Sequence, residues 1–82
     1  MSLVELTEFL VKSLAENQEN VSVKEFETDE ENTILIQVLV DESDMGRVIG
    51  KGGKLANAIR TLVQASSYIK DNKKVRINID SF

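Results

Sequence analysis

The amino-acid sequence predicts a small α+β domain, an α/β sandwich in which three helices cover one face of a three-stranded mixed sheet. Two segments carry apolar residues at helical spacing, and three others alternate in the manner of strands. With one short helix added, the expected order is α-β-β-α-α-β. About thirty residues separate the last two strands, which is too many for a hairpin, so we expect a crossover that returns to the same sheet.

The first helix is expected over residues 3–16. Ser2 and Glu5 have the spacing of a capping box, in which the serine accepts from a free helix N–H and the glutamate reaches back. The apolar positions that recur at helical spacing are Leu3, Leu6, Leu10 and Leu14. The polar residues 17–20 end this segment.

The first two strands differ in the strength of their pattern. Residues 21–27 alternate weakly, and Phe26 lies out of phase, which indicates a bulge or a second apolar contact. Residues 33–40 alternate strongly. Their β-branched residues on one face are Ile34, Ile36, Val38 and Val40. Leu35 and Leu39 point to the other face. We slightly favour the interpretation that loops or the first helix cover them; the alternative is that they form a groove wall or a dimer surface.

The second half of the chain contains two helices and a strand. Asp41 or Ser43 is expected to cap a short helix that runs into a glycine-rich turn. A longer helix begins after Gly53 and fades by Tyr68 and Ile69. Residues 73–80 then form a strand with a clean alternation of apolar and polar positions.

The composition bounds the possible functions. The 82 residues indicate one domain, spanning 1–82 without a linker. The absence of cysteine and histidine argues against disulfides, thiolate metal sites and the commonest general base. No nucleophile–base pair or metal cluster is evident, so we expect neither an enzyme nor a cofactor. The N-terminus does not resemble a signal peptide, and a cytoplasmic location without membrane contact is expected.

The net charge of −4 conceals an uneven distribution. Residues 1–44 carry two lysines against twelve acidic residues, whereas residues 45–82 carry eight basic residues against two acidic ones. This asymmetry favours a cationic binding surface in the second half, although an uneven solvated surface would give the same counts.

All four glycines lie within residues 46–53, in the sequence Gly46-Arg47-Val48-Ile49-Gly50-Lys51-Gly52-Gly53. A phosphate-binding P-loop would need one more residue between its glycines and a hydroxyl residue after the lysine. A dinucleotide fingerprint would need a third glycine at Leu55 and a preceding strand. Neither motif fits.

The Gly-x-x-Gly pattern of residues 50–53, between two helices, fits the turn with which a KH domain holds about four nucleotides of a single strand. Glycines let two helices meet tightly and leave backbone N–H groups bare, and the helix that follows adds partial positive charge. A plain helix–helix turn is the alternative. The residues expected to contact RNA are Gly50, Lys51, Gly52, Gly53, Arg47, Lys54, Ile49 and Arg60. Candidates for base contacts are Ile36, Val38 and Leu39.

From Gly46 through Lys54 to Arg60, the chain resembles the KhpA family of small bacterial single-KH-domain proteins. The resemblance implies a type II KH fold and a cytoplasmic RNA-binding protein described as an RNA chaperone. It also implies self-association, pairing with the larger protein KhpB, and effects on cell shape and cell-wall synthesis. One of the two positions between the outer glycines is itself a glycine, Gly52, so only Lys51 offers a side chain there.

The sequence is consistent with two functions. The first is binding of single-stranded RNA, which should be weak because no aromatic side chain lies near the glycines to stack on bases. The second is a protein-interaction or dimerisation module with a KH fold, carried by Leu35, Leu39 and the end of the long helix. No small-molecule substrate is expected.

Overall fold

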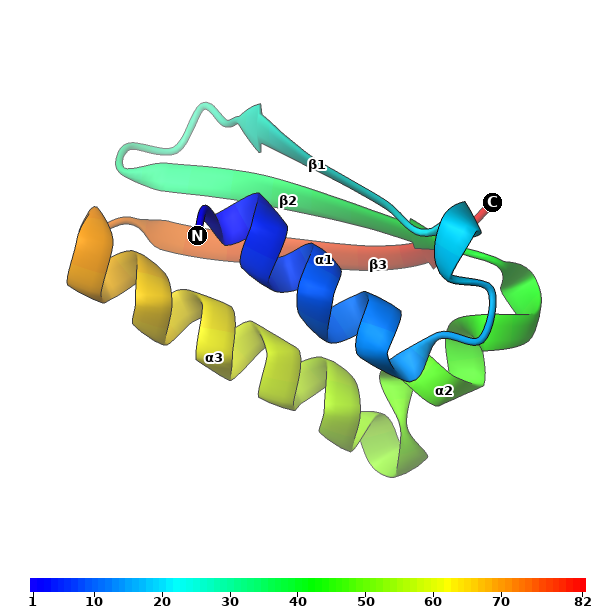
Figure 1. Cartoon of the computed structure of the whole chain (residues 1–82). Helices are drawn as coiled ribbons and strands as arrows, with labels where there is room; N and C mark the ends of the chain where they lie inside the picture. Colours follow the sequence, from blue (N-terminus) through cyan, green and yellow to red (C-terminus); the bar gives the residue numbers. More distant parts are fainter.

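A three-stranded sheet forms one layer of the structure and three helices form the other (Figure 1). The computed structural model describes residues 1–82. Its elements are α1 (Leu3–Leu14), β1 (Ser22–Glu27), β2 (Thr33–Val40), α2 (Met45–Ile49), α3 (Lys54–Lys70) and β3 (Lys74–Ser81). Short 3₁₀ turns occupy Gln18–Asn20, Glu42–Asp44 and Lys51–Gly53. The predicted α+β class and the order α-β-β-α-α-β are confirmed.

The central strand of the sheet is β2. It pairs antiparallel with β1, where Val23 lies opposite Val38, and parallel with β3, where Ile36 lies beside Ile77. The predicted return of the last strand to the same sheet is therefore confirmed. It leaves β3 as an edge strand, which lies next to α3 at its start and diverges from that helix toward its end (Figure 1).

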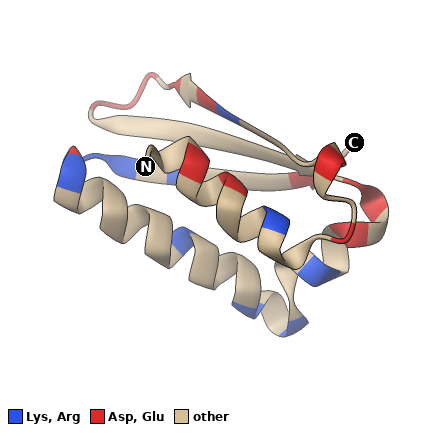
Figure 2. Ribbon diagram, viewed as in Figure 1, with Lys and Arg blue, Asp and Glu red and all other residues tan.

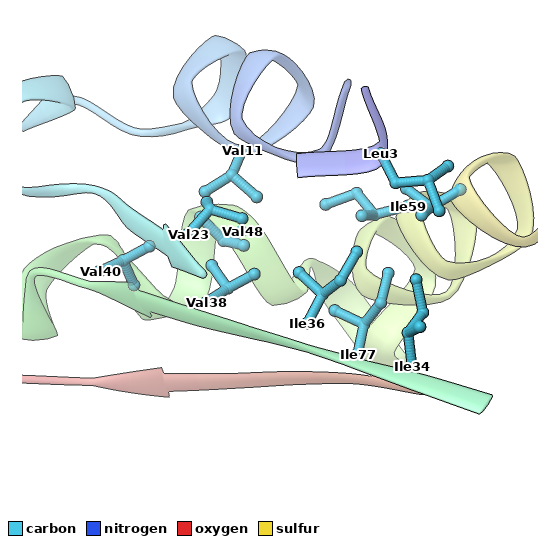
Figure 3. Packing of buried hydrophobic residues seen from close by; sticks show 11 residues of the cluster. Leu3, Val11, Val23, Ile34, Ile36, Val38, Val40, Val48, Ile59 and Ile77 are labelled. Atoms are coloured by element: carbon cyan, nitrogen blue, oxygen red, sulfur yellow. The ribbon is translucent and has the colours of Figure 1, made fainter. Parts of the chain in front are cut away.

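The core lies between the sheet and the helices, where aliphatic side chains from every helix and strand meet (Figure 3). Its fully buried members are Val11, Ile36, Val38, Val40, Val48 and Val63. The alternation of β2 places three of these on the helix side of the sheet. Because Val48 of α2 is one of them, the short helix before the glycines is anchored in the core.

The first helix ends at Leu14, two residues earlier than predicted. The backbone N–H groups of Glu16 and Asn17 donate to the carboxylate of Asp44, at 3.0 and 2.8 Å, instead of continuing the helix. The predicted capping box is confirmed: Ser2 Oγ accepts from the N–H of Glu5, and the Glu5 carboxylate accepts from the N–H of Ser2.

The open face of the sheet differs from expectation. Phe26 causes no bulge; it stays in regular register opposite Leu35 on the face away from the helices. The expected covering of Leu35 and Leu39 by the first helix is wrong, because α1 packs against the opposite face. Both leucines remain half-buried, and Phe26 is 48% exposed.

Candidate nucleic-acid interface

The turn from Gly50 to Gly53, called the glycine turn below, joins the end of α2 to the start of α3. Gly50, Gly52 and Gly53 all have positive φ angles, of 76°, 63° and 78°. Gly50 combines its φ with a ψ of 169°, a region that is essentially restricted to glycine. The backbone therefore reverses direction within four residues, and α3 begins directly after Gly53.

Gly50 also lacks the space for a side chain. A Cβ atom at this position would lie 2.7 Å from Cγ of Leu55 and 3.0 Å from its backbone nitrogen. At Gly52 nothing lies within 4 Å. The two glycines thus serve different purposes: Gly50 lets the first turn of α3 pack against the end of α2, while Gly52 keeps the outer surface of the turn bare.

Two backbone N–H groups of the turn have no partner within the chain. Gly50 donates to the carbonyl of Gly46 at 3.0 Å, and Gly53 donates to the carbonyl of Gly50 at 3.1 Å. No helical turn spans Gly50, so the N–H groups of Lys51 and Gly52 have no carbonyl of α2 to donate to. These groups lie on an exposed turn at the start of a 17-residue helix, whose first N–H groups carry partial positive charge.

The cations around the glycine turn are not equivalent. Lys51 and Lys54 are exposed and take part in no ion pair. Arg47 is instead held by acidic neighbours: its guanidinium lies 2.9 Å from Glu16 and 3.2 Å from Asp44, and it donates to the carbonyl of Ser43. Its positive charge is already partly neutralised, whereas the two lysines present theirs to solvent.

Asp44 is a structural residue of this site that the sequence analysis missed. Its fully buried carboxylate accepts from the backbone of Glu16 and Asn17 and from the Asn17 side chain, and it pairs with Arg47. The hydrogen bonds from Asn17 and Glu16, together with the nearby guanidinium, hold the pKa of Asp44 below its usual value, against the opposing effect of desolvation. Asp44 thereby joins the end of α1 to the start of α2.

The predicted caps of α2 are wrong. Asp41 lies just before the preceding 3₁₀ turn and Ser43 lies within it, and the Ser43 hydroxyl donates to the carboxylate of Asp41. Asp44 occupies the N-cap position without a side-chain capping bond. Its partners are 27 and 28 residues away in the sequence, so no local pattern could identify it.

The remaining predicted site residues fall into two groups. Ile49 is half-buried at the end of α2, and Arg60 is exposed two turns along α3, where it donates to the carbonyl of Ile77 at 3.4 Å. Ile36 and Val38 are fully buried in the core and cannot contact a base, so these two candidates are wrong. Half-buried Leu39 lies on the face of the sheet away from the helices.

Basic and acidic residues are separated in the folded structure as well as along the sequence (Figure 2). Basic residues gather at the glycine turn, along α3 and at the start of β3, while acidic residues gather on α1, on β1 and in the turns that flank β2. The structure contains no group of three or more carboxylates arranged to hold a metal ion. None of its helices has the length and apolar character required to cross a bilayer.

A Gly-x-x-Gly turn between two helices, within an α-β-β-α-α-β chain, defines a type II KH fold. Solved structures support this assignment. The chain superposes with a TM-score of 0.69 and 20% identity on Era in complex with MgGDPNP and part of 16S ribosomal RNA, covering 96% of this chain and 29% of that one. A variant of Aquifex aeolicus Era bound to GDP and AlF4⁻ gives a TM-score of 0.71 at 20% identity, covering 98% of this chain and 30% of that one.

Within this fold, the chain belongs to the KhpA/KhpB family: the family model described as "KhpA/KhpB, KH domain" matches residues 4–79. The RNA-binding protein KhpA of Clostridium perfringens is 47% identical over 75 residues, covering 92% of this chain and 96% of that protein. KhpA of Borreliella burgdorferi is 42% identical over 76 residues, covering 93% and 89%. KhpA of Listeria monocytogenes is 44% identical, covering 92% and 95%. The resemblance to this family is thus confirmed.

Proposed function

We propose that this protein binds single-stranded RNA through the glycine turn and that it is not an enzyme. The observation that carries the proposal is the pair of unpartnered N–H groups, of Lys51 and Gly52, on a bare turn between two cations that form no ion pair. Such groups, at the start of a helix, suit a phosphate oxygen. Relatives at 42–47% identity that are named RNA-binding proteins support the same conclusion.

The contacts to RNA divide by type. The backbone of Gly50–Gly53 holds one phosphate, Lys51 contacts it or its neighbour, and Lys54 extends the positive surface onto α3. Arg47 contributes less, since Glu16 and Asp44 already share its charge. Ile49, just before the turn, and Arg60, about two turns beyond it on α3, complete the expected site.

The affinity of one domain should be low. Stacking on an aromatic side chain contributes roughly 1–3 kcal/mol per base in single-strand binding proteins. The exposed aromatic residues here lie on α1, on the open face of the sheet, near the end of α3 and at the C-terminus, none of them at the glycine turn. We expect micromolar or weaker binding of short RNA, which a dimer would strengthen by offering two turns to one strand.

The test is the salt dependence of RNA binding, measured by fluorescence anisotropy with a labelled oligouridylate. Each neutralised phosphate of a single strand contributes a slope of about −0.7 in a plot of log K against log salt, so two or three contacts give roughly −1.5 to −2. The double variant Lys51→Asp with Gly52→Asp should lose this binding and stay folded. The space around Gly52 is open, and aspartate is among the residues that tolerate positive φ.

A control with the same charge change separates the turn from overall charge. Lys24→Asp with Asn20→Asp alters exposed residues on and before β1, away from the turn. It should keep most of the RNA affinity. Unchanged affinity in the variant of the glycine turn, or equal loss in the two double variants, would refute the assignment of the site.

The cellular role that we propose follows from the family. It is that of a cytoplasmic RNA chaperone that self-associates and pairs with a KhpB-type protein, with effects on cell shape and cell-wall synthesis. The support is membership of the KhpA/KhpB family. Co-purification of KhpB with the tagged protein, compared before and after ribonuclease treatment, tests the pairing and distinguishes direct contact from a shared RNA.

A second candidate function, that of a protein-interaction or dimerisation module, is favoured by one observation. An apolar groove of about 200 Å³ runs between α1 and α3, with Leu10, Leu14, Leu55 and Leu62 among its lining residues. Leu62 is 52% exposed there, and Leu35 and Leu39 are half-buried on the open face of the sheet. If this function dominates, the glycine-turn variant should retain its protein partners and the unchanged protein should show no salt-sensitive RNA binding.

A further inference from the structure

Three polar side chains of α3, those of Arg60, Gln64 and Ser67, bond to the edge strand β3, and Asn57 accepts from Arg60; these four residues form a line that we call the polar seam. Gln64 donates from Nε2 to the carbonyl of Lys73 at 2.9 Å, and its Oε1 accepts from the N–H of Val75 at 2.8 Å. The hydroxyl of Ser67 donates to the same Lys73 carbonyl at 2.7 Å. The seam therefore bonds directly to the backbone of the free sheet edge.

The register of β3 against β2 explains why Gln64 can bond to the backbone of β3. The N–H of Lys74 donates to Asn32 and that of Phe82 donates to Val40, so even-numbered residues of β3 point their backbone groups toward β2. The odd-numbered residues point theirs outward, where the sheet has no further strand. Gln64 takes the outward N–H of Val75 and the carbonyl of Lys73, and so closes the first part of this edge.

The two ends of the polar seam are held unequally. Near the glycine turn, exposed Arg60 makes one long bond of 3.4 Å to Ile77 and shares its guanidinium with Asn57. At the far end, half-buried Gln64 makes two short bonds, and Ser67 is fully buried. An exposed arginine can leave a carbonyl at little cost, whereas removing Gln64 would leave the N–H of Val75 without a partner and the carbonyl of Lys73 with Ser67 alone. The seam can open from the glycine turn as far as Gln64.

The length of this openable segment is limited. Gln64 lies eleven residues after Gly53, or about 16 Å along the axis of α3. Beyond it, exposed Lys73 forms no ion pair and would favour a longer bound strand. Positive charge therefore continues past Gln64, while access to the sheet edge does not.

We propose that Gln64 is a positioning residue that ends the RNA groove and sets how many nucleotides one domain holds. The inference rests on the proposed RNA binding at the glycine turn. A strand that starts at Gly50–Gly53 runs between α3 and the free edge of β3 and stops where the Gln64 amide bonds to Lys73 and Val75. Removing this amide should let the strand advance to Lys73.

The experiment compares oligouridylates of four and eight nucleotides on Gln64→Leu, with Thr61→Leu as the matched control. Thr61 is exposed one turn earlier on α3, and its side chain makes no hydrogen bond. The salt slopes of the unchanged protein and of the control should be nearly equal for the two lengths. Gln64→Leu should give a slope steeper by about 0.7 or more for the longer strand only, because one further phosphate is neutralised.

Two additional measurements make the result specific. Adding Lys73→Ala to Gln64→Leu should remove the extra slope. Hydrogen exchange at the Val75 amide should accelerate in Gln64→Leu and remain unchanged in the control, which shows that the bond itself was lost. Gln64→Met serves the same purpose if the leucine variant does not fold.

The outcomes are distinguishable. Faster exchange at Val75 with no length-dependent change in slope would show that Gln64 only supports the fold, and would overturn the inference while leaving RNA binding intact. Absence of salt-sensitive binding by the unchanged protein at either length would refute the proposed function and this inference with it.

Discussion

Replacing Gly50 with alanine should destabilise the whole domain, and the structure allows the effect to be estimated. The new Cβ would lie 2.7 Å from Cγ of Leu55 and 3.0 Å from its backbone nitrogen, so the start of α3 would have to move away from α2. Alanine would also have to adopt φ 76° and ψ 169°. These two costs are separate, because one is steric and the other is conformational.

Their magnitude is large for a chain of this size. The glycine-restricted backbone angles cost roughly 1–3 kcal/mol, and forcing a methyl group into a filled space costs a further ~1–3 kcal/mol. A domain of 82 residues has a free energy of unfolding of roughly 4–12 kcal/mol. Gly50→Ala should therefore remove about 2–6 kcal/mol and lower the melting temperature by at least about 10 °C.

Urea unfolding followed by circular dichroism measures this change, and two comparisons test the reasoning. Gly46→Ala is the control, since Gly46 lies in α2 and a Cβ atom added there would meet nothing within 4 Å. This variant should leave stability equal or raise it by up to about 1 kcal/mol. In a double-mutant cycle, Leu55→Ala should restore part of the loss, because it removes the closest contact, at Cγ, and leaves the contact to the backbone nitrogen. Equal stability of the Gly50 and Gly46 variants would refute the argument.

Three further predictions follow from the same contacts. The pKa of Asp44 is lower in the folded chain than in the unfolded one. Its carboxylate therefore stabilises the fold at pH values above the unfolded-state pKa of about 3.9. This stabilisation is lost as the pH falls through the lower folded-state pKa. The gap in urea midpoint between the protein and Asp44→Asn should shrink below about pH 4, and a gap that persists to pH 2 would contradict this. Lys51→Ala should reduce the magnitude of the RNA salt slope by about 0.7, and Arg47→Ala by clearly less, because its charge is already paired; equal effects would show that Arg47 leaves its acidic partners. Ser2→Ala should cost about 1 kcal/mol by removing the helix cap, and thermal melts that show no change would contradict the role of the capping box.

Much of the fold was predictable because its signals are local. The alternation of β2 correctly separated Ile36 and Val38, which are buried, from Leu35 on the open face. The capping box at Ser2 and the Gly-x-x-Gly pattern were equally recognisable, since each involves residues within a few positions of one another. The errors arose where a residue distant in the sequence changed the structure that a local pattern predicted. At the end of α1, for example, two backbone N–H groups donate to Asp44 and not to carbonyls of the helix.

The site shows the same division. Sequence identified the glycine turn and its cations, but counted Arg47 with the lysines, because ion pairing to Glu16 across 31 positions is invisible in the sequence. It also placed Ile36 and Val38 beside the bases, because alternation identifies the two faces of a strand without showing which one the helices cover. The hydrogen bonds of Gln64 could not be anticipated at all, since they depend on the register of β3 against β2.

Local signals along the chain were enough to define which segments form helices and strands, where the backbone must adopt glycine conformations, and which family the chain resembles. Periodicity, capping and turn chemistry act over a few residues, so they can be read along the chain. Tertiary packing, by contrast, sets which cations remain free, which apolar faces are covered and which backbone groups of the β3 edge are bonded by α3. Those properties depend on groups brought together from distant parts of the chain, and their distances exist only in the folded molecule.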